Sequence, residues 1–399
     1  MTIDGFTAPP ALVEHARRFR AEGGTPAAPR VAATVLLLRP AGPDFEVYVI
    51  RRVAAMAFGG MYAFPGGQVD PSDSQAHLDW AGPEPVEWAG RLGLAPEAAQ
   101  AVVCAAAREV FEEAGVLLAG PDPSTVVGDV SGDDWEAARQ DLEAHRTGFV
   151  DLLAGRRLTL RSDLLLPWSR WITPEFEPRR FDTYFFVALL PEGQRTRDVS
   201  GEADHTMWVR PADALAAWAQ RASGVTGIPA VAMQAYGYAE LVVAETHRGC
   251  QLSWTTLAAI GYVESRHGSA NGATLKSTGR AEPEIIGDPL DGQDGRSRIL
   301  DTDRGQLDRD TVYDRAIGPM QFIPSTWQAV GADADNDGRK DPHDIDDAAL
   351  AAGNYLCEGG RNMTIPGDWW GAILSYNDVR RYAQAVFDKA DEYGRLSRT

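Results

Sequence analysis

The chain has 399 residues, which suggests two or three domains, and 44% of them are hydrophobic, enough for ordinary cores. A net charge of −19 disfavours a nucleic-acid partner and an anionic membrane surface. No apolar run in the sequence approaches the roughly 20 residues that span a bilayer. Residues 1–30 carry no apolar secretion signal, which suggests a cytoplasmic location.

The first half of the sequence predicts an α+β domain with a mixed sheet. Apolar and β-branched runs predict strands at residues 31–38, 45–52, 164–173, 181–188 and 202–209. Helices are predicted at residues 11–22, 108–115, 135–155 and 211–220. The segment 221–229 contains Gly and Pro and is predicted to be a linker.

The stretch 108–116, Arg-Glu-Val-Phe-Glu-Glu-Ala-Gly-Val, predicts an acidic helix that stops at Gly115. Its carboxylates share one face through i, i+3, i+4 spacing: Glu109, Glu112 and Glu113. Such charges repel one another unless a cation lies among them, and Mg²⁺ prefers oxygen ligands and substrate phosphates. Arg108 can reach Glu112 or hold Glu109 in place. The alternative is a solvated acidic helix face.

An upstream turn, Phe64-Pro-Gly66-Gly67, adds to this pattern. Together the turn and the acidic helix resemble the Nudix hydrolase family, whose motif ends in Arg-Glu-apolar-x-Glu-Glu-x-Gly-apolar. Residues 108–116 match that part at every specified position. The first part of the motif differs from the family pattern in two ways. An insertion at about 71–100 separates the turn from the helix, and Gln100 stands where the family has Glu. Trp80, Trp88 and Leu92 predict that this insertion is packed.

The resemblance covers about residues 30–220 and implies hydrolysis of a diphosphate linkage in a nucleoside diphosphate derivative. It implies Mg²⁺ or Mn²⁺ at Glu109, Glu112 and Glu113, with Glu113 also taking part in catalysis. Structural roles fall to Arg108, Gly66, Gly67 and Gly115. A further metal ligand or base is expected at Glu202, beside Asp204, although a surface acidic pair is the alternative. Nucleotide sugars, dinucleotides and coenzyme A remain open as substrates, and Arg51-Arg52 before the turn weakly resembles the coenzyme A-cleaving branch.

The second half has its own set of motifs. An apolar helix at 254–263 ends in Glu264-Ser265, and a Glu after such a run is a candidate for a raised pKa and for general-acid catalysis. By itself this pattern also suits a surface Glu at a helix end. The motifs Gly318-Pro-Met-Gln321 and Tyr376-Asn377 follow it in the chain.

This order resembles the lytic transglycosylases of the lysozyme-like superfamily, from about residue 228 onward, and implies a mainly α domain. The resemblance implies cleavage of peptidoglycan, the bacterial cell-wall polymer, between N-acetylmuramic acid and N-acetylglucosamine. Glu264 would act first as acid and then as base, leaving a 1,6-anhydro end; no second carboxyl group is nominated. The substrate-binding residues would be Ser265, Gln321, Tyr376 and Asn377.

The loop 333–344 follows the EF-hand pattern. Acidic residues occupy positions 1, 3, 5, 9 and 12 of the loop: Asp333, Asp335, Asp337, Asp341 and Asp344. Gly338 holds position 6, and Arg339 holds position 7, where the backbone carbonyl is the ligand. The pattern predicts metal binding, for which Ca²⁺ is the candidate. Some transglycosylases of this group carry such a loop, so the resemblance implies that the site is structural. The alternative is an acidic Asn/Gly turn.

Of the three cysteines, Cys104 is predicted to lie in a core, while Cys250 and Cys357 could pair. Related transglycosylase domains have cysteines at both of these places, so the resemblance implies a disulfide.

The domains are expected at residues 1–225 and 226–399, and they imply different compartments, since peptidoglycan lies in the cell envelope. A bifunctional enzyme is the main interpretation. The alternatives are that only one half is active, with the other vestigial or glycan-binding, or that the gene fusion is an artefact.

Overall fold

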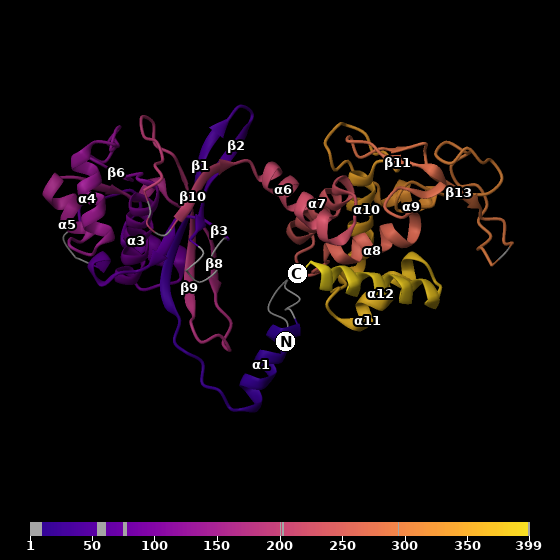
Figure 1. The fold of residues 1–399 in the computed structure, drawn as a ribbon, viewed down its shortest axis with the longest axis horizontal. Coiled ribbons are helices and arrows are strands. Elements are labelled where there is room, and N and C mark those ends of the chain that lie inside the picture. The colour runs from indigo at the N-terminus through magenta and orange to yellow at the C-terminus, as the bar shows by residue number, and fades with distance from the viewer. Residues whose placement is uncertain are drawn as a thin grey trace. The chain divides into compact units, whose positions relative to one another are not determined.

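The structure is a computed structural model that describes residues 10–53, 61–74, 78–199, 201, 203–293 and 295–397. Within it the chain divides into two compact units, a first unit of Glu14–Pro211 and a second unit of Ala212–Thr399 together with Met1–Val13 (Figure 1). Helix α1 (Pro10–Ala21) opens the described chain, close to the position predicted for the first helix.

Within the described residues, a seven-stranded sheet forms the body of the first unit. Its strands are β1 (Arg30–Ala41), β2 (Asp44–Arg52), β3 (Tyr62–Ala63), β4 (Gly66–Gln68), β8 (Leu166–Ile172), β9 (Phe181–Leu189) and β10 (Ala203–Val209). The order is β10-β2-β1-β9-β8, with β3 paired to β2 and β4 to β1. The β1–β9 pair is parallel and the others are antiparallel, which confirms the predicted mixed sheet.

One face of the sheet is buried because its inward side chains recur at every second position. They are Ala33, Val35 and Leu37 in β1, and Tyr184, Phe186 and Ala188 in β9. Helix α3 (Pro96–Ala114) packs on this face (Figure 1). The predicted acidic helix is its C-terminal part, and Gly115 ends it with a φ of 67°, in the left-handed region that favours glycine.

The predicted insertion is packed where it is described. It contains η1 (Pro71–Ser74), β5 (Trp80–Ala81) and α2 (Pro85–Leu92). Trp88 is fully buried, lies 6.0 Å from the ring of Phe186, and donates from Nε1 to Oγ of Ser162 at 3.2 Å. After α3 come β6 (Ala119–Gly120), α4 (Asp133–Glu143), α5 (Phe149–Arg156), β7 (Thr159–Arg161) and η2 (Ser162–Leu164).

The second unit is mainly helical, as predicted. Its helices are α6 (Pro211–Thr226), α7 (Ala230–Thr246), α8 (Trp254–Ser265), α9 (Pro324–Val330), α10 (Ile345–Leu356), α11 (Pro366–Tyr376) and α12 (Arg380–Leu396). Short elements complete it: η3 (Ala270–Gly272), β11 (Thr274–Leu275), β12 (Ala281–Glu282), β13 (Ile286–Pro289), β14 (Arg315–Ile317) and η4 (Glu358–Gly360). Among all described residues, no helix combines the length and apolar character needed to cross a membrane.

The prediction of a linker at 221–229 is wrong for residues 221–226, because α6 continues to Thr226. The helix therefore crosses the domain boundary that we expected after residue 225. Ala219 and Ala222 of α6 lie in the core of the second unit together with Ile228. The hydroxyl of Ser223 donates to the carbonyl oxygen of Ile228 at 2.6 Å, which holds the chain beyond the helix. Burial of small side chains on one face therefore keeps this Gly-containing segment helical.

Cys250 and Cys357 form a disulfide, which confirms the expected pairing. Their Cα atoms lie 5.4 Å apart, and both residues belong to the core of the second unit. Cys104 is buried in α3 as a free thiol, as predicted for a core residue.

Loss of the disulfide is expected to destabilise the second unit. The bond joins residues separated by 107 positions, and the chain-entropy account gives roughly 2–5 kcal/mol for such a cross-link. Calorimetric unfolding of the full chain, with and without reductant, measures the effect, and the reduced wild type should match Cys250→Ala/Cys357→Ala. The control variant Cys104→Ala should keep the response to reductant. A wild-type transition that reductant leaves in place would contradict the expectation.

Candidate active sites

The Gly-rich turn and the acidic helix meet at a cavity of about 360 Å³ in the first unit. Antiparallel pairing with β1 places β4 beside the C-terminal half of α3. The cavity is lined mainly by polar groups: Gly66, Gly67, Gln68, Asp70, Arg108, Glu109, Glu112, Glu113, Glu143 and His145. The structure thus brings together the two motifs that the insertion separates in the sequence.

Arg108 connects the walls of this cavity. Its Nε donates to Oδ1 of the fully buried Asp73 at 3.0 Å, and its Nη2 donates to the carbonyl oxygen of Gln68 at 2.8 Å. Nη1 lies 2.9 Å from Oε1 of Glu109 and 3.0 Å from Oε2 of Glu112. One buried cation therefore links the insertion, the turn and the acidic helix.

The two glycines of the turn allow the backbone to approach α3. The N–H of Gly66 donates to Oε2 of Glu113 at 2.8 Å. A Cβ on Gly67 would lie 2.4 Å from Oε1 of Glu109, and one on Gly66 would lie 2.6 Å from the carbonyl oxygen of Ala33. Real Cβ atoms do not come so close, so another residue at Gly66 would displace the turn from β1, and one at Gly67 would force the turn or the Glu109 carboxylate to move.

Among the described residues, the carboxylates around this cavity outnumber Arg108, the arginine that pairs with them. Burial raises the pKa of Glu109 to about 7, although Arg108 acts in the opposite direction. Burial also raises the pKa of Glu112, again against Arg108. Clustered carboxylate oxygens with surplus negative charge are the ligands that hard divalent cations prefer. The set of Glu109, Glu112 and Glu113 therefore fits Mg²⁺ or Mn²⁺ by its chemistry.

The additional acidic ligand stays a prediction. Glu202 lies outside the described residues. Its neighbour Asp204, in β10, pairs with Arg51, with Nε and Oδ1 2.7 Å apart. Asp204 is not one of the described residues that line the cavity.

The second constellation forms at the C-terminal end of α8. This helix is buried on all sides over 256–261, so Glu264 emerges from a dense interior. Burial raises the pKa of the Glu264 carboxyl group to about 7, and the Tyr382 hydroxyl lies near enough to lower that pKa, although it forms no hydrogen bond of normal geometry among the described residues. The side chain remains partly accessible. It can therefore hold a proton near neutral pH and still meet a ligand.

Three motifs that are distant in the sequence converge here on the segment 318–321. The Oγ of Ser265 donates to the carbonyl oxygen of Pro319 at 2.6 Å. The hydroxyl of Tyr376 donates to the carbonyl oxygen of Met320 at 2.7 Å. Burial and the negative charge of Glu264 raise the pKa of Tyr376, so the two groups lie close enough to interact. The convergence gives Glu264 a fixed polar surrounding.

The remaining predicted substrate residues hold backbone contacts of their own. Gln321 has a φ of 52° and donates from Nε2 to the carbonyl oxygen of Gly318 at 2.9 Å. Asn377 is exposed, and its N–H donates to Ile373 at the end of α11. Ser265 is 2% exposed, so its observed contacts are internal. The substrate contacts of these residues stay predictions.

The acidic loop precedes α10 and gathers a different set of carboxylates than the EF-hand count indicated. Asp333, Asp335 and Asp347 each place one oxygen within 4.8 Å of the others. Asp347, which was not predicted, accepts from the N–H groups of Ala334 at 2.6 Å and Asp341 at 2.8 Å. Asp344 caps α10 instead, accepting from the N–H of Asp346 at 2.8 Å.

The other predicted loop ligands are engaged within the protein. Asp337 accepts from the N–H of Arg339 at 2.8 Å, and Asp341 pairs with Arg280. Oδ1 of Asp333 is buried without a hydrogen-bond partner among the described residues, which suits a cation ligand.

Sequence reasoning missed three residues that shape these sites. Asp73 lies in the insertion, where no motif marks it. Tyr382 lies on α12, beyond the last motif. Asp347 could have been found, because Asp-Ile-Asp-Asp at 344–347 extends the acidic run past the twelve-residue count.

Comparisons with known proteins find both families in this chain. A family model described as NUDT19 Nudix domain matches residues 89–231, and one described as Transglycosylase SLT domain matches residues 300–364. The chain is 26% identical over 207 residues to acyl-coenzyme A diphosphatase NUDT19 of Xenopus laevis, and 27% identical over 212 residues to that of Homo sapiens. These matches cover 43% and 44% of this chain and 54% and 56% of the relatives, so the chain spans about half the length of the curated relatives it matches.

A solved NUDIX hydrolase from Alicyclobacillus acidocaldarius is 28% identical, with a TM-score of 0.38 over 49% of this chain and 84% of that one. The Nudix match contains the acidic helix, and the SLT match contains the segment 318–321 and the acidic loop. Both families are enzymes. The chain therefore carries a Nudix hydrolase domain followed by a transglycosylase SLT domain.

Proposed function

We propose that the chain is a bifunctional enzyme. Its Nudix domain hydrolyses a diphosphate linkage in a nucleoside diphosphate derivative, with Mg²⁺ or Mn²⁺ held by Glu109, Glu112 and Glu113. The observation that supports this proposal is the cavity where the Gly-rich turn meets buried carboxylates that outnumber Arg108. Such an ion, when bound, stabilises phosphate charge and activates water.

The residues around these carboxylates position them. Arg108 orients Glu109 and Glu112 through Nη1, and the N–H of Gly66 holds Glu113. Among the diphosphate compounds, an acyl-coenzyme A is the substrate class we favour, because two relatives are named acyl-coenzyme A diphosphatases. Nucleotide sugars and dinucleotides are the comparison substrates.

The SLT domain, we propose, cleaves peptidoglycan strands without water. Protonated Glu264 gives its proton to the glycosidic oxygen as the bond to C1 of N-acetylmuramic acid breaks. The resulting carboxylate then takes the proton of the 6-hydroxyl as that oxygen bonds to C1, which closes a 1,6-anhydro ring. The pKa of about 7 and the partial exposure of Glu264 support this double role.

The loop 333–347 is proposed to bind Ca²⁺ as a structural ion, with Asp333, Asp335 and Asp347 among its ligands. Their mutual approach and the unpartnered Oδ1 of Asp333 support this assignment. The competing function is a chain with one active domain, in which the other retains its fold and only binds ligand. Assaying both reactions on the same full-length variants separates these cases.

Glu113→Gln is expected to lower diphosphate hydrolysis by more than about 100-fold, beyond the roughly 10–100-fold cost of losing a group that only supports a metal ligand. The reason is the loss of a charged oxygen donor at the cation site. Steady-state turnover of an acyl-coenzyme A, a nucleotide sugar and a dinucleotide measures it. Peptidoglycan cleavage by the same variant serves as the control for the amount of intact full-length chain. Unchanged turnover of all three compounds would rule out the site.

Glu264→Gln is expected to lose roughly 10²–10⁴-fold in glycan cleavage, the usual contribution of acid–base catalysis, because an amide can neither donate nor accept the proton. Product analysis of the wild type by mass spectrometry should show 1,6-anhydro ends. Diphosphate hydrolysis by the variant is the internal control. Wild-type products with reducing ends alone would make the domain a hydrolase, and absence of cleavage would make it a glycan-binding domain.

Tyr382→Phe is expected to move the alkaline limb of the glycan-cleavage profile to higher pH. The Tyr382 hydroxyl lowers the pKa of Glu264, so its removal raises that pKa, and the acid form persists further above pH 7. The profile of kcat/KM against pH measures the shift, with Tyr238→Phe on α7 as the matched control. A limb that moves to lower pH, or stays in place, would contradict this assignment.

A further inference from the structure

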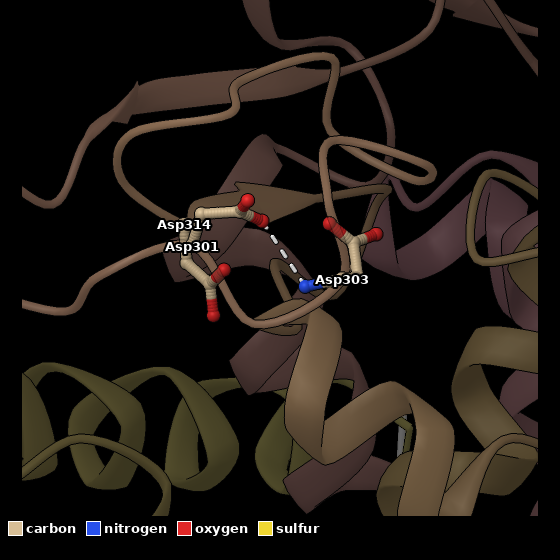
Figure 2. A group of neighbouring side chains, drawn as sticks. All are labelled: Asp301, Asp303 and Asp314. Carbon is tan, nitrogen blue, oxygen red and sulfur yellow. Dashed lines mark hydrogen bonds between the residues drawn. The ribbon is translucent and has the colours of Figure 1, made fainter.

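A second group of carboxylates in the SLT domain belongs to neither active site nor to the loop 333–347. It lies in the loop 295–314, which leads into β14. Asp301, Asp303 and Asp314 each place one oxygen within 4.8 Å of the others. Figure 2 shows the carboxylate of Asp303 turned toward the side chains of Asp301 and Asp314.

Backbone pairing brings the two limbs of this loop together. The N–H of Asp301 donates to the carbonyl oxygen of Val312 at 3.1 Å, and the N–H of Asp314 donates to that of Ile299 at 3.2 Å. Because the bridge pairs Leu300 with Tyr313, Asp301 and Asp314 lie diagonally across the two limbs of the loop. Asp303 turns back toward them, with its own N–H donating to Oδ1 of Asp301 at 3.1 Å.

Two of the three side chains are removed from water. Asp314 is fully buried, and Thr302 satisfies both its oxygens, donating from N to Oδ1 and from Oγ1 to Oδ2, each at 2.8 Å. Asp303 is 5% exposed, and its Oδ2 accepts from the N–H of Leu307 at 2.7 Å. Oδ1 of Asp303 is buried and has no hydrogen-bond partner among the described residues. A buried carboxylate oxygen without a donor is costly unless a cation faces it.

No arginine or lysine of the described chain forms an ion pair with these three carboxylates. Arg296 pairs with Asp288 and Asp291, and Arg315 pairs with Asp310, while Arg304 is exposed. The group is therefore left with negative charge that its own protein does not neutralise.

We propose that Asp301, Asp303 and Asp314 bind a divalent cation at a site separate from the loop 333–347. Oxygen-only ligands select a hard ion, and Ca²⁺ suits an irregular loop better than Mg²⁺, which demands octahedral geometry. Asp301 is only partly buried and gives the ion a path from solvent.

The position of the site gives the ion a structural consequence. Asp314 directly precedes β14, which leads into the segment 318–321. The partner strand β13 contains Gly287, and a Cβ there would lie 3.0 Å from Oε1 of Gln321. An ion that joins the limbs of the loop therefore fixes the strand pair against which Gln321 rests.

The test counts bound ions on the full chain. Protein stripped with a chelator is dialysed to equilibrium against CaCl₂, and in a parallel arm against MgCl₂. Asp303→Asn and Asp335→Asn should each bind one Ca²⁺ fewer than the wild type, and the double variant two fewer, because Asp335 belongs to the other loop. Asp288→Asn removes an exposed charge from β13 and should bind as many as the wild type.

Thermal unfolding gives an independent readout. In Ca²⁺ the wild type should melt above Asp303→Asn. In the presence of chelator, the difference in melting temperature between the wild type and Asp303→Asn should vanish or reverse. The reason is that the variant lacks one buried charge that repels its neighbours. If Asp303→Asn does not fold, Asp301→Asn, at a partly exposed position, replaces it in both measurements. An unchanged ion count in Asp303→Asn and in Asp301→Asn, with either salt, would overturn the proposal.

Discussion

An ionised carboxyl group inside a protein must be paired, protonated or bound to a cation, and this constraint governs both units of the chain. Asp73, with no solvent exposure, is paired with Arg108, which also holds Glu109 and Glu112. Glu264 is the protonated case, since burial raises its pKa to about 7. The buried Asp303 has neither a cationic partner nor a donor on Oδ1 among the described residues. The acidity of the sequence is therefore concentrated at particular sites as well as spread over the surface.

The two proposed sites need opposite electrostatics, and their neighbouring residues differ accordingly. A metal site requires carboxylates that stay charged, and Arg108 lowers the pKa of Glu109 against the effect of burial. A general acid instead requires a carboxyl group that stays protonated. Among the described residues, the groups that interact with the Glu264 carboxyl are the neutral hydroxyls of Tyr382 and Tyr376, not a lysine or arginine. A cation at that place would favour the carboxylate and remove the proton that the proposed reaction uses.

Local patterns predicted the elements well where the pattern itself fixes the structure. Helix spacing and Gly115 located the acidic end of α3, because both act within one turn. Contacts between residues that are distant in the chain could not be predicted from the sequence. The extension of α6 depends on Ala222 packing in the core of the second unit, and Asp73 has meaning only beside Arg108. Counting loop positions chose Asp344, which caps a helix, where the tertiary fold brings in Asp347.

The disulfide has a topological effect as well as an energetic one. The stretch between Cys250 and Cys357 contains Glu264 and both acidic clusters of the second unit, while Tyr376 lies beyond it. A single proteolytic cut in the loop 295–314 would give two polypeptides still joined through sulfur. Glu264 would belong to one and Tyr376 to the other. Such a nicked molecule would keep its full mass on a non-reducing gel, and its parts would separate only in reductant.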